Sequence, residues 1–240
     1  MAPVPPARMA RAVDAYVTAH THNIPVGLPL AIPLPAKFRW LTAMVGAYGT
    51  GYGVIYYAVH HPYPMNASRN PTMPRGAPVV LQMTGNSPLT PLPTGAVARL
   101  DWFWGALPLG PAPGDRRVGN GDPVPIQLAN GVCAVEYRNW GDAIQWTRGS
   151  WTIVALAGSP GIGMQTANRV NQLLAEAPLP NFTGLIVVST PTSAQAPGTF
   201  ATDMAWVRGP DLYTLQDGEV ETRPGGTVFG MVRALQWSHP

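Results

Sequence analysis

Proline and glycine constrain this chain more than any other feature, because 28 Pro and 26 Gly together occupy 54 of its 240 positions. Proline lacks an amide donor and glycine weakens helix interiors, so long uninterrupted helices are excluded. A hydrophobic fraction of 46% with eight Trp still demands a packed core. Only 11% of the residues are charged and Lys37 is the one lysine, which excludes a disordered chain and a helical bundle. The composition therefore predicts a loop-rich globular protein dominated by sheets.

The hydrophobic periodicity predicts an α+β fold, with antiparallel sheets built from hairpins and packed by two to three amphipathic helices. The sequence Trp146–Gly149 (Trp-Thr-Arg-Gly) is echoed at Trp206–Gly209 (Trp-Val-Arg-Gly), so a pseudo-repeat of a β-hairpin and helix unit is one arrangement that fits. Helices are expected at 7–19, 94–107, 163–177 and 227–235, and strands at 38–47, 53–61, 79–83, 132–137, 143–147, 151–157, 185–189, 202–207 and 212–216.

The chain divides into four parts by composition. Residues 1–23 are predicted to be an N-terminal helix and lead-in, and residues 24–125 a first α+β half that ends in a Pro/Gly linker. Residues 126–236 are predicted to be a second α+β half. Residues 237–240 (Trp-Ser-His-Pro) resemble the start of a streptavidin-affinity tag, so we expect them to be a tag remnant.

The segment from Leu41 to Val59 carries no charge and is long enough to be considered as a membrane span. Its four glycines and four tyrosines instead indicate two strands about a Gly-rich turn, so no transmembrane span is expected. Cys133 is the only cysteine, which excludes a disulfide framework, and its alternating surroundings predict a small buried residue on a strand.

The net charge is only +3 and Arg116-Arg117 is the only adjacent basic pair, so the dense basic stripe of a nucleic-acid-binding protein is missing. The halves nevertheless differ, with +6 over residues 1–120 and −3 over residues 121–240. This asymmetry either steers one end toward an anionic surface such as a bacterial envelope or reflects scatter among few charges.

Aromatic and turn motifs follow one another in a fixed order over about residues 24–236, at Leu28-Pro29, Leu34-Pro35, Tyr56, Tyr57, Trp146, Gly149, Trp151, Ala167, Leu179-Pro180, Gly184, Trp206, Gly209 and Tyr213. This order resembles that of a family of uncharacterised extracytoplasmic proteins of Gram-positive, mainly spore-forming bacteria. The resemblance implies export, often as a lipoprotein or anchored ectodomain, and implies no known catalytic residue. The Pro62–Pro78 loop and the Pro/Gly linker depart from the family pattern.

Few residues are candidates for catalysis, because the chain has only twelve acids. Asp101 beside Trp102 and Trp104, and Glu136 on a strand, are candidate general acids with raised pKa, or alternatively partners of arginines. His60 is a further candidate. His20, His22, His60 and His61 lack a nearby carboxylate and are expected to be ordinary polar residues, so we predict no metal and no cofactor.

Aromatic side chains are the remaining functional hint, because three successive aromatic residues on a helix cannot all face inward. Trp102 and Trp104, together with Tyr56, Tyr57 and His61, are the predicted ligand-binding residues. We expect a non-enzymatic binding or accessory module, secreted or attached to the cell envelope, that recognises an envelope component, a peptide or a glycan. The alternatives are a secreted hydrolase and a structural subunit of a surface assembly; the sequence does not determine the oligomeric state.

Overall fold

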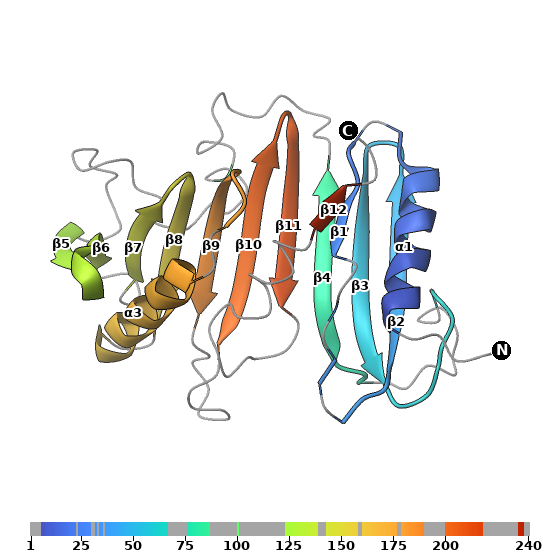
Figure 1. The fold of residues 1–240 in the computed structure, drawn as a ribbon, viewed down its shortest axis with the longest axis horizontal. Coiled ribbons are helices and arrows are strands. Elements are labelled where there is room, and N and C mark those ends of the chain that lie inside the picture. The colour runs from blue at the N-terminus through green and yellow to red at the C-terminus, as the bar shows by residue number, and fades with distance from the viewer. Residues whose placement is uncertain are drawn as a thin grey trace. The chain divides into compact units, whose positions relative to one another are not determined.

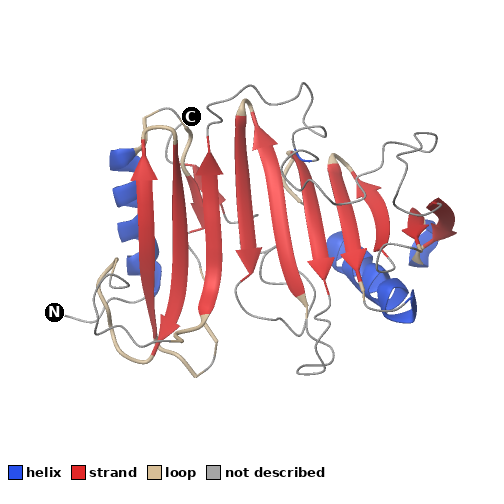
Figure 2. Ribbon diagram, turned by 180° about the vertical axis from the view of Figure 1, so that it is seen from behind, coloured by secondary structure: helices blue, strands red, loops and turns tan. Residues whose placement is uncertain are grey.

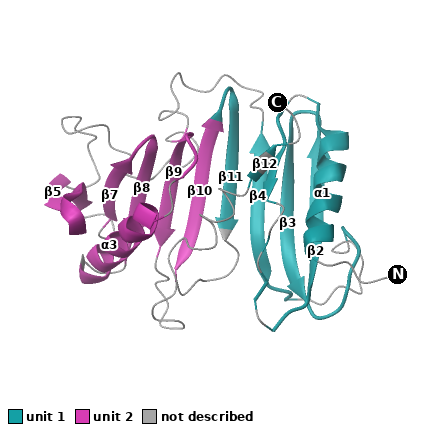
Figure 3. Ribbon diagram, viewed as in Figure 1, with its two compact units in different colours: residues 1–91, 208–219, 227–240 teal, residues 92–207, 220–226 magenta. Residues whose placement is uncertain are grey.

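The computed structural model describes the protein over residues 6–22, 24–29, 32, 34–35, 37–66, 76–86, 100, 123–138, 143–157, 160–176, 179–189, 200–217 and 235–237. These residues are mainly β-strand with two α-helices. They fall into two compact units, the first formed by residues 1–91, 208–219 and 227–240, and the second by residues 92–207 and 220–226 (Figure 3). Segments from both ends of the chain form the first unit.

Unit 1 is an antiparallel sheet in the order β2-β3-β4-β11, covered on one face by helix α1 and by the short pair β1 and β12 (Figures 1 and 2). Helix α1 buries Met9, Ala10, Val13 and Val17 and packs on β2. The elements are α1 (Pro6–His20), β1 (Gly27–Pro29), β2 (Trp40–Tyr48), β3 (Gly51–Val59), β4 (Val79–Asn86), β11 (Asp211–Asp217) and β12 (Leu235–Trp237).

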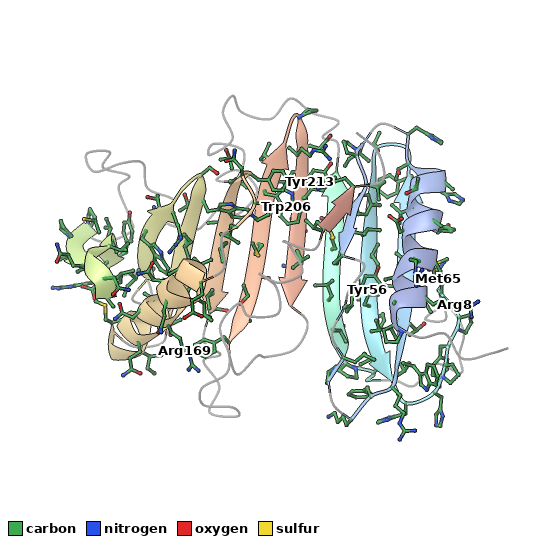
Figure 4. All side chains as sticks on the ribbon, in the orientation of Figure 1. Arg8, Tyr56, Met65, Arg169, Trp206 and Tyr213 are labelled. Carbon is green, nitrogen blue, oxygen red and sulfur yellow. The ribbon has the colours of Figure 1, made fainter. Side chains whose placement is uncertain are left out.

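Strands β1 and β12 are held onto this sheet by buried tyrosines (Figure 4). The Tyr52 hydroxyl donates to the Gly27 carbonyl at 2.9 Å and accepts from the Gly27 amide at 3.2 Å. The Tyr213 hydroxyl donates to the Pro25 carbonyl at 2.9 Å. Both tyrosines flank Gly85 of β4 in register, and a side chain at Gly85 would collide with the Tyr52 ring at 2.5 Å.

Trp237 lies in β12, opposite Gly27 of β1. Its ring meets Tyr213 edge-on at 5.0 Å, and the Arg208 guanidinium lies 4.1 Å from its centre. A residue that we expected to belong to a tag remnant is thus part of the packing of unit 1. The expected helix over 227–235 does not reach Leu235, which begins this strand, and its other residues lie outside the described part of the chain.

Unit 2 is a mixed sheet in the order β10-β9-β8-β7-β6-β5, with α3 on one face. Its strands are not all antiparallel as expected: β8 and β9 run parallel, because α3 returns the chain across the sheet between them. The elements are β5 (Pro123–Gln127), a 3₁₀ turn (Ala129–Gly131), β6 (Cys133–Tyr137), β7 (Ala143–Arg148), β8 (Trp151–Leu156), α3 (Pro160–Glu176), β9 (Thr183–Ser189) and β10 (Ala201–Arg208).

The sequence favours a turn at Arg148-Gly149, which would place Trp146 opposite Trp151. The β7–β8 hairpin instead turns one residue later, at Gly149-Ser150, and Gly149 has φ +59°. Trp146 therefore pairs with Ile153 and Trp151 with Arg148, so the two tryptophans share a face without lying directly opposite. Cys133 is exposed, contrary to the prediction of a core position. The reason is that β6 pairs on one side with the edge strand β5, whose residues are half-buried or exposed.

Helix α3 also holds the turn between β5 and β6. The Asn168 side chain accepts a hydrogen bond from the Ala129 amide at 2.6 Å, and the Asn171 side chain donates to the Ala129 carbonyl at 3.3 Å. Asn171 is buried, so its loss would leave the carbonyl with a poorer partner.

We expect Asn171→Ala to lower the free energy of unfolding by about 1–2 kcal/mol, because it removes a part-buried hydrogen bond and leaves a small void around a buried side chain. Urea denaturation of the purified chain measures this change. Asn168→Ala is the matched comparison and should cost less, because its bond is exposed. Equal and negligible losses in both variants would contradict the role of α3 in holding this turn.

Candidate functional site

The predicted ligand-binding residues that the structure describes, Tyr56, Tyr57 and His61, lie on or directly after the β2–β3 hairpin of unit 1. A two-residue turn at Gly49-Thr50 fixes the register, in which Tyr56 pairs with Ala43 and Tyr57 with Thr42. Because side chains alternate between the two faces of a strand, neighbouring Tyr56 and Tyr57 point in opposite directions. One face lies under α1 and the β1–β12 pair, and the other is the face turned toward the viewer in Figure 2.

Tyr56 lies on the covered face and is fully buried (Figure 4), so it is not accessible to a ligand and its expected binding role is not supported. Burial raises the pKa of its hydroxyl, and the negative charge of Asp14 on α1 raises that pKa further. The pKa of Tyr52 is raised by the same burial, with the Gly27 backbone hydrogen bond acting in the opposite direction. Both phenols are therefore neutral packing groups at physiological pH.

The opposite face carries Tyr57, which is half-buried and accessible. Met44 and Ile55 form the next cross-strand pair on this face and are also half-exposed. Tyr48, at the end of β2, is 57% exposed and is one of two large hydrophobic residues described as exposed. The aromatic and aliphatic side chains of Tyr57, Met44, Ile55 and Tyr48 therefore form a row along the hairpin, which we call the open row.

A pair of glycines interrupts the open row. Gly46 and Gly53 are directly opposite each other between the Met44–Ile55 pair and Tyr48. A Cβ atom at either glycine would meet nothing within 4 Å. The row therefore contains a gap with exposed backbone as its floor, and glycine within a strand commonly marks a place where a ligand or another backbone approaches closely.

The end of the hairpin opposite its turn is basic and aromatic. Phe38, just before β2, packs on the His60 ring with the ring centres 4.6 Å apart. The Lys37 ammonium lies 5.2 Å from the centre of the same Phe38 ring. Lys37, Arg39, His60 and His61 are all exposed. His60, expected as a catalytic candidate, and His61, expected as a ligand residue, are thus surface neighbours at one end of the open row.

The two catalytic candidates that the structure describes, Glu136 and His60, belong to different units. Glu136 accepts a 2.9 Å hydrogen bond from the Arg138 guanidinium, which is the arginine pairing expected as the alternative to a general acid. Glu136 belongs to unit 2, whereas His60 belongs to unit 1. Asp101, Trp102 and Trp104 lie outside the described residues. Of the helix expected at 94–107, only Leu100 is described, and it is helical and buried.

The histidines do not form a metal centre within the described part of the chain, where no three His, Cys, Asp or Glu side chains gather. The His20 ring hydrogen-bonds to the Tyr16 carbonyl at 2.7 Å and stacks on the Tyr16 ring. Neither described helix is long and apolar enough to pass through a bilayer.

Sequence reasoning missed the gap in the open row because it did not fix the turn at Gly49-Thr50, and so it did not establish which residues of the two strands lie opposite each other. The turn uses only Gly49 and Thr50, which leaves Gly46 and Gly53 inside strands. Their symmetrical spacing about the turn was the signal that places them opposite each other. Neither a protein-family model, nor a curated protein, nor a solved structure matches this chain.

Proposed function

We propose that the protein is a non-enzymatic, extracytoplasmic binding module that holds a glycan chain of the cell envelope on the open row of unit 1. The observation that carries the proposal is the open Gly46–Gly53 floor, bordered by half-exposed Met44 and Ile55 and by exposed Tyr48. Sugar rings present flat apolar faces that stack on aromatic side chains, and a floor without side chains lets such a ring approach the sheet.

A glycan fits this hairpin better than a peptide strand does. A peptide that binds by strand addition needs a free strand edge. Along the middle of β2 that edge is occupied by Asn66, whose side chain accepts from the Val45 amide at 2.7 Å and whose amide donates to the Ala43 carbonyl at 2.5 Å. The Thr42 hydroxyl, on the same face as its partner Tyr57, donates to the Pro64 carbonyl at 2.9 Å, so the chain also covers that face at Thr42. The accessible surface is therefore the part of the face that carries Tyr57, Met44 and Ile55, and not the strand edge.

Filling the floor should abolish binding without damaging the fold. We expect Gly53→Val to leave the free energy of unfolding unchanged or to raise it by about 0.5–1 kcal/mol, since valine suits a strand better than glycine and the space above Gly53 is empty. The same change should block a stacked sugar ring. Tyr57→Ala should weaken binding by about tenfold through loss of a stacking partner.

The measurement is a titration of the chain with soluble oligosaccharides, namely cellohexaose, chitohexaose and hexagalacturonate, followed by NMR shifts of the Gly46 and Gly53 amides. Thr147→Val is the matched control, because Thr147 is an exposed strand residue of unit 2. Binding of a sugar with the same affinity to wild type, Gly53→Val and Tyr57→Ala would refute the proposed site. No shift with any of the three sugars would count against glycan binding.

A further inference from the structure

The part of the chain that builds the open row contains no acidic residue. No Asp or Glu occurs between Asp14 and Asp101, whereas an even spread of the twelve acids would place about four there. The same stretch contains five basic residues, at positions 37, 39, 69, 75 and 99. Strands β2, β3 and β4 all come from this stretch, so the sheet presents no carboxylate along them.

Two acids of unit 1, Asp14 and Asp211, lie away from the open row. Asp14 is on α1, over the covered face. Burial raises the pKa of Tyr52 and Tyr56, and the negative charge of Asp14 raises it further by a smaller amount. Asp211 is buried at the start of β11, and its charge likewise adds to the raised pKa of Tyr52 and Tyr213. Neither carboxylate is positioned to repel an anion that lies on the open row.

The cations at the end of the hairpin opposite its turn lie beside an aromatic ring. The Phe38 ring contacts both the Lys37 ammonium and the His60 ring, which limits the positions that these groups can take. Arg39 directly precedes β2, and His60 and His61 directly follow β3, so the paired strands bring these residues to the same end of the hairpin. Lys37, Arg39 and the two imidazoles form what we call the basic end.

We propose that the glycan held on the open row is an acidic one, whose carboxylate or other anionic groups are bound at the basic end while its sugar rings lie along Tyr57 and the glycine floor. This inference rests on the proposed function and adds the chemical class of the ligand. Charge complementarity supports it: cations gather at one end of a surface whose three strands carry no acid. Ion pairs at an exposed surface weaken as salt screens them, which makes the proposal measurable.

The test compares hexagalacturonate with its fully methyl-esterified form, in which each carboxylate is replaced by a neutral ester. We expect wild-type protein to bind the acid at least about tenfold more tightly than the neutral ester at low ionic strength, and this difference should shrink as salt is raised. The double variant Lys37→Gln/Arg39→Gln should lose most of the difference while binding the ester as wild type does. Isothermal titration calorimetry measures both affinities.

The matched control is Arg138→Gln/Arg169→Gln in unit 2, which removes the same amount of charge, and in which Arg169 lies near the Phe200 ring much as Lys37 lies over Phe38. Equal effects of the two double variants, or equal affinity of wild type for acid and ester, would overturn the inference. The salt dependence of wild type tests the proposal without any substitution, in case a variant fails to fold.

The failure of this inference can be told from the failure of the proposed function. If Gly53→Val abolishes and Tyr57→Ala weakens the binding of both ligands, but acid and ester bind wild type equally, the glycan site stands and its acidic specificity falls. If those two variants bind as wild type does, both proposals fall. Vesicles of equal parts phosphatidylglycerol and phosphatidylcholine form a third arm, and binding to them in place of hexagalacturonate, dependent on Lys37 and Arg39, would overturn the choice of a glycan.

Discussion

Replacing Gly184 by alanine should lower the free energy of unfolding by about 2–3 kcal/mol, a large loss for a single methyl group. Gly184 of β9 lies beside Trp151 of the parallel strand β8. A Cβ atom at this position would come within 2.3 Å of the Trp151 ring. The ring cannot move away easily, because it is buried and its Nε1 donates to the Pro180 carbonyl at 2.8 Å. The Gly184 amide is also held, by the Ser150 carbonyl at 3.2 Å.

Urea denaturation followed by tryptophan fluorescence would measure the loss. Gly161→Ala is the matched control: it lies in the first turn of α3 with open space around it, and there alanine should be neutral or stabilise the helix by up to about 1 kcal/mol. In a Trp151→Leu background, Gly184→Ala should lower the free energy of unfolding by less than it does in wild type, because the smaller side chain makes room for the methyl group. If Gly184→Ala unfolds at the same urea concentration as wild type, the close approach of Trp151 is wrong.

Replacing Trp237 by alanine should lower the free energy of unfolding by about 2–3 kcal/mol, because the ring joins β12 to β1 and to β11. Its atoms would lie within 2.9 Å of any Cβ at Gly27, so the ring rests directly on the Gly27 backbone. Its removal also eliminates the edge-on contact with Tyr213 and the contact with the Arg208 guanidinium. Exposed Tyr48→Ala is the matched control and should change stability by less than about 0.5 kcal/mol.

Comparing the thermal and urea unfolding of Trp237→Ala with that of a truncated chain also tests whether residues 237–240 are a tag remnant. Truncation of the chain before Trp237 should destabilise unit 1 about as much as Trp237→Ala does. A truncated chain that is as stable as wild type would show that residues 237–240 contribute nothing to the fold, as a tag remnant would.

Periodicity along the chain predicted most strands, and the helix at 163–177, close to where they occur, because alternation and 3.6-residue spacing are local properties. Register was harder to predict. Placing the β7–β8 turn at Arg148-Gly149 instead of Gly149-Ser150 was an error of one residue, yet it changed the partner of Trp146 to Ile153. In the β2–β3 hairpin the same uncertainty hid the Gly46–Gly53 pair.

The faces of the strands could not be assigned from alternation, because alternation does not say which face another element covers. Tyr56 and Tyr57 were equivalent in the sequence, and the packing of α1 and β1 on one face buries Tyr56 and leaves Tyr57 accessible. Cys133 looked like a core residue for the same reason, and its place on β6 beside the edge strand exposes it. Coverage depends on contacts between segments that are distant in the chain.

By itself, the sequence determined that this protein is rich in sheet, that its helices are short, and that an acid-free basic stretch supplies three of its strands. These properties follow from proline, glycine and charge content, which act locally or as simple sums. Only the tertiary structure decided which glycines form a floor and which lie under an aromatic ring, as Gly184 does under Trp151. The physical reason is that cross-strand neighbours are fixed by turns and by packing layers, neither of which any short window of sequence contains.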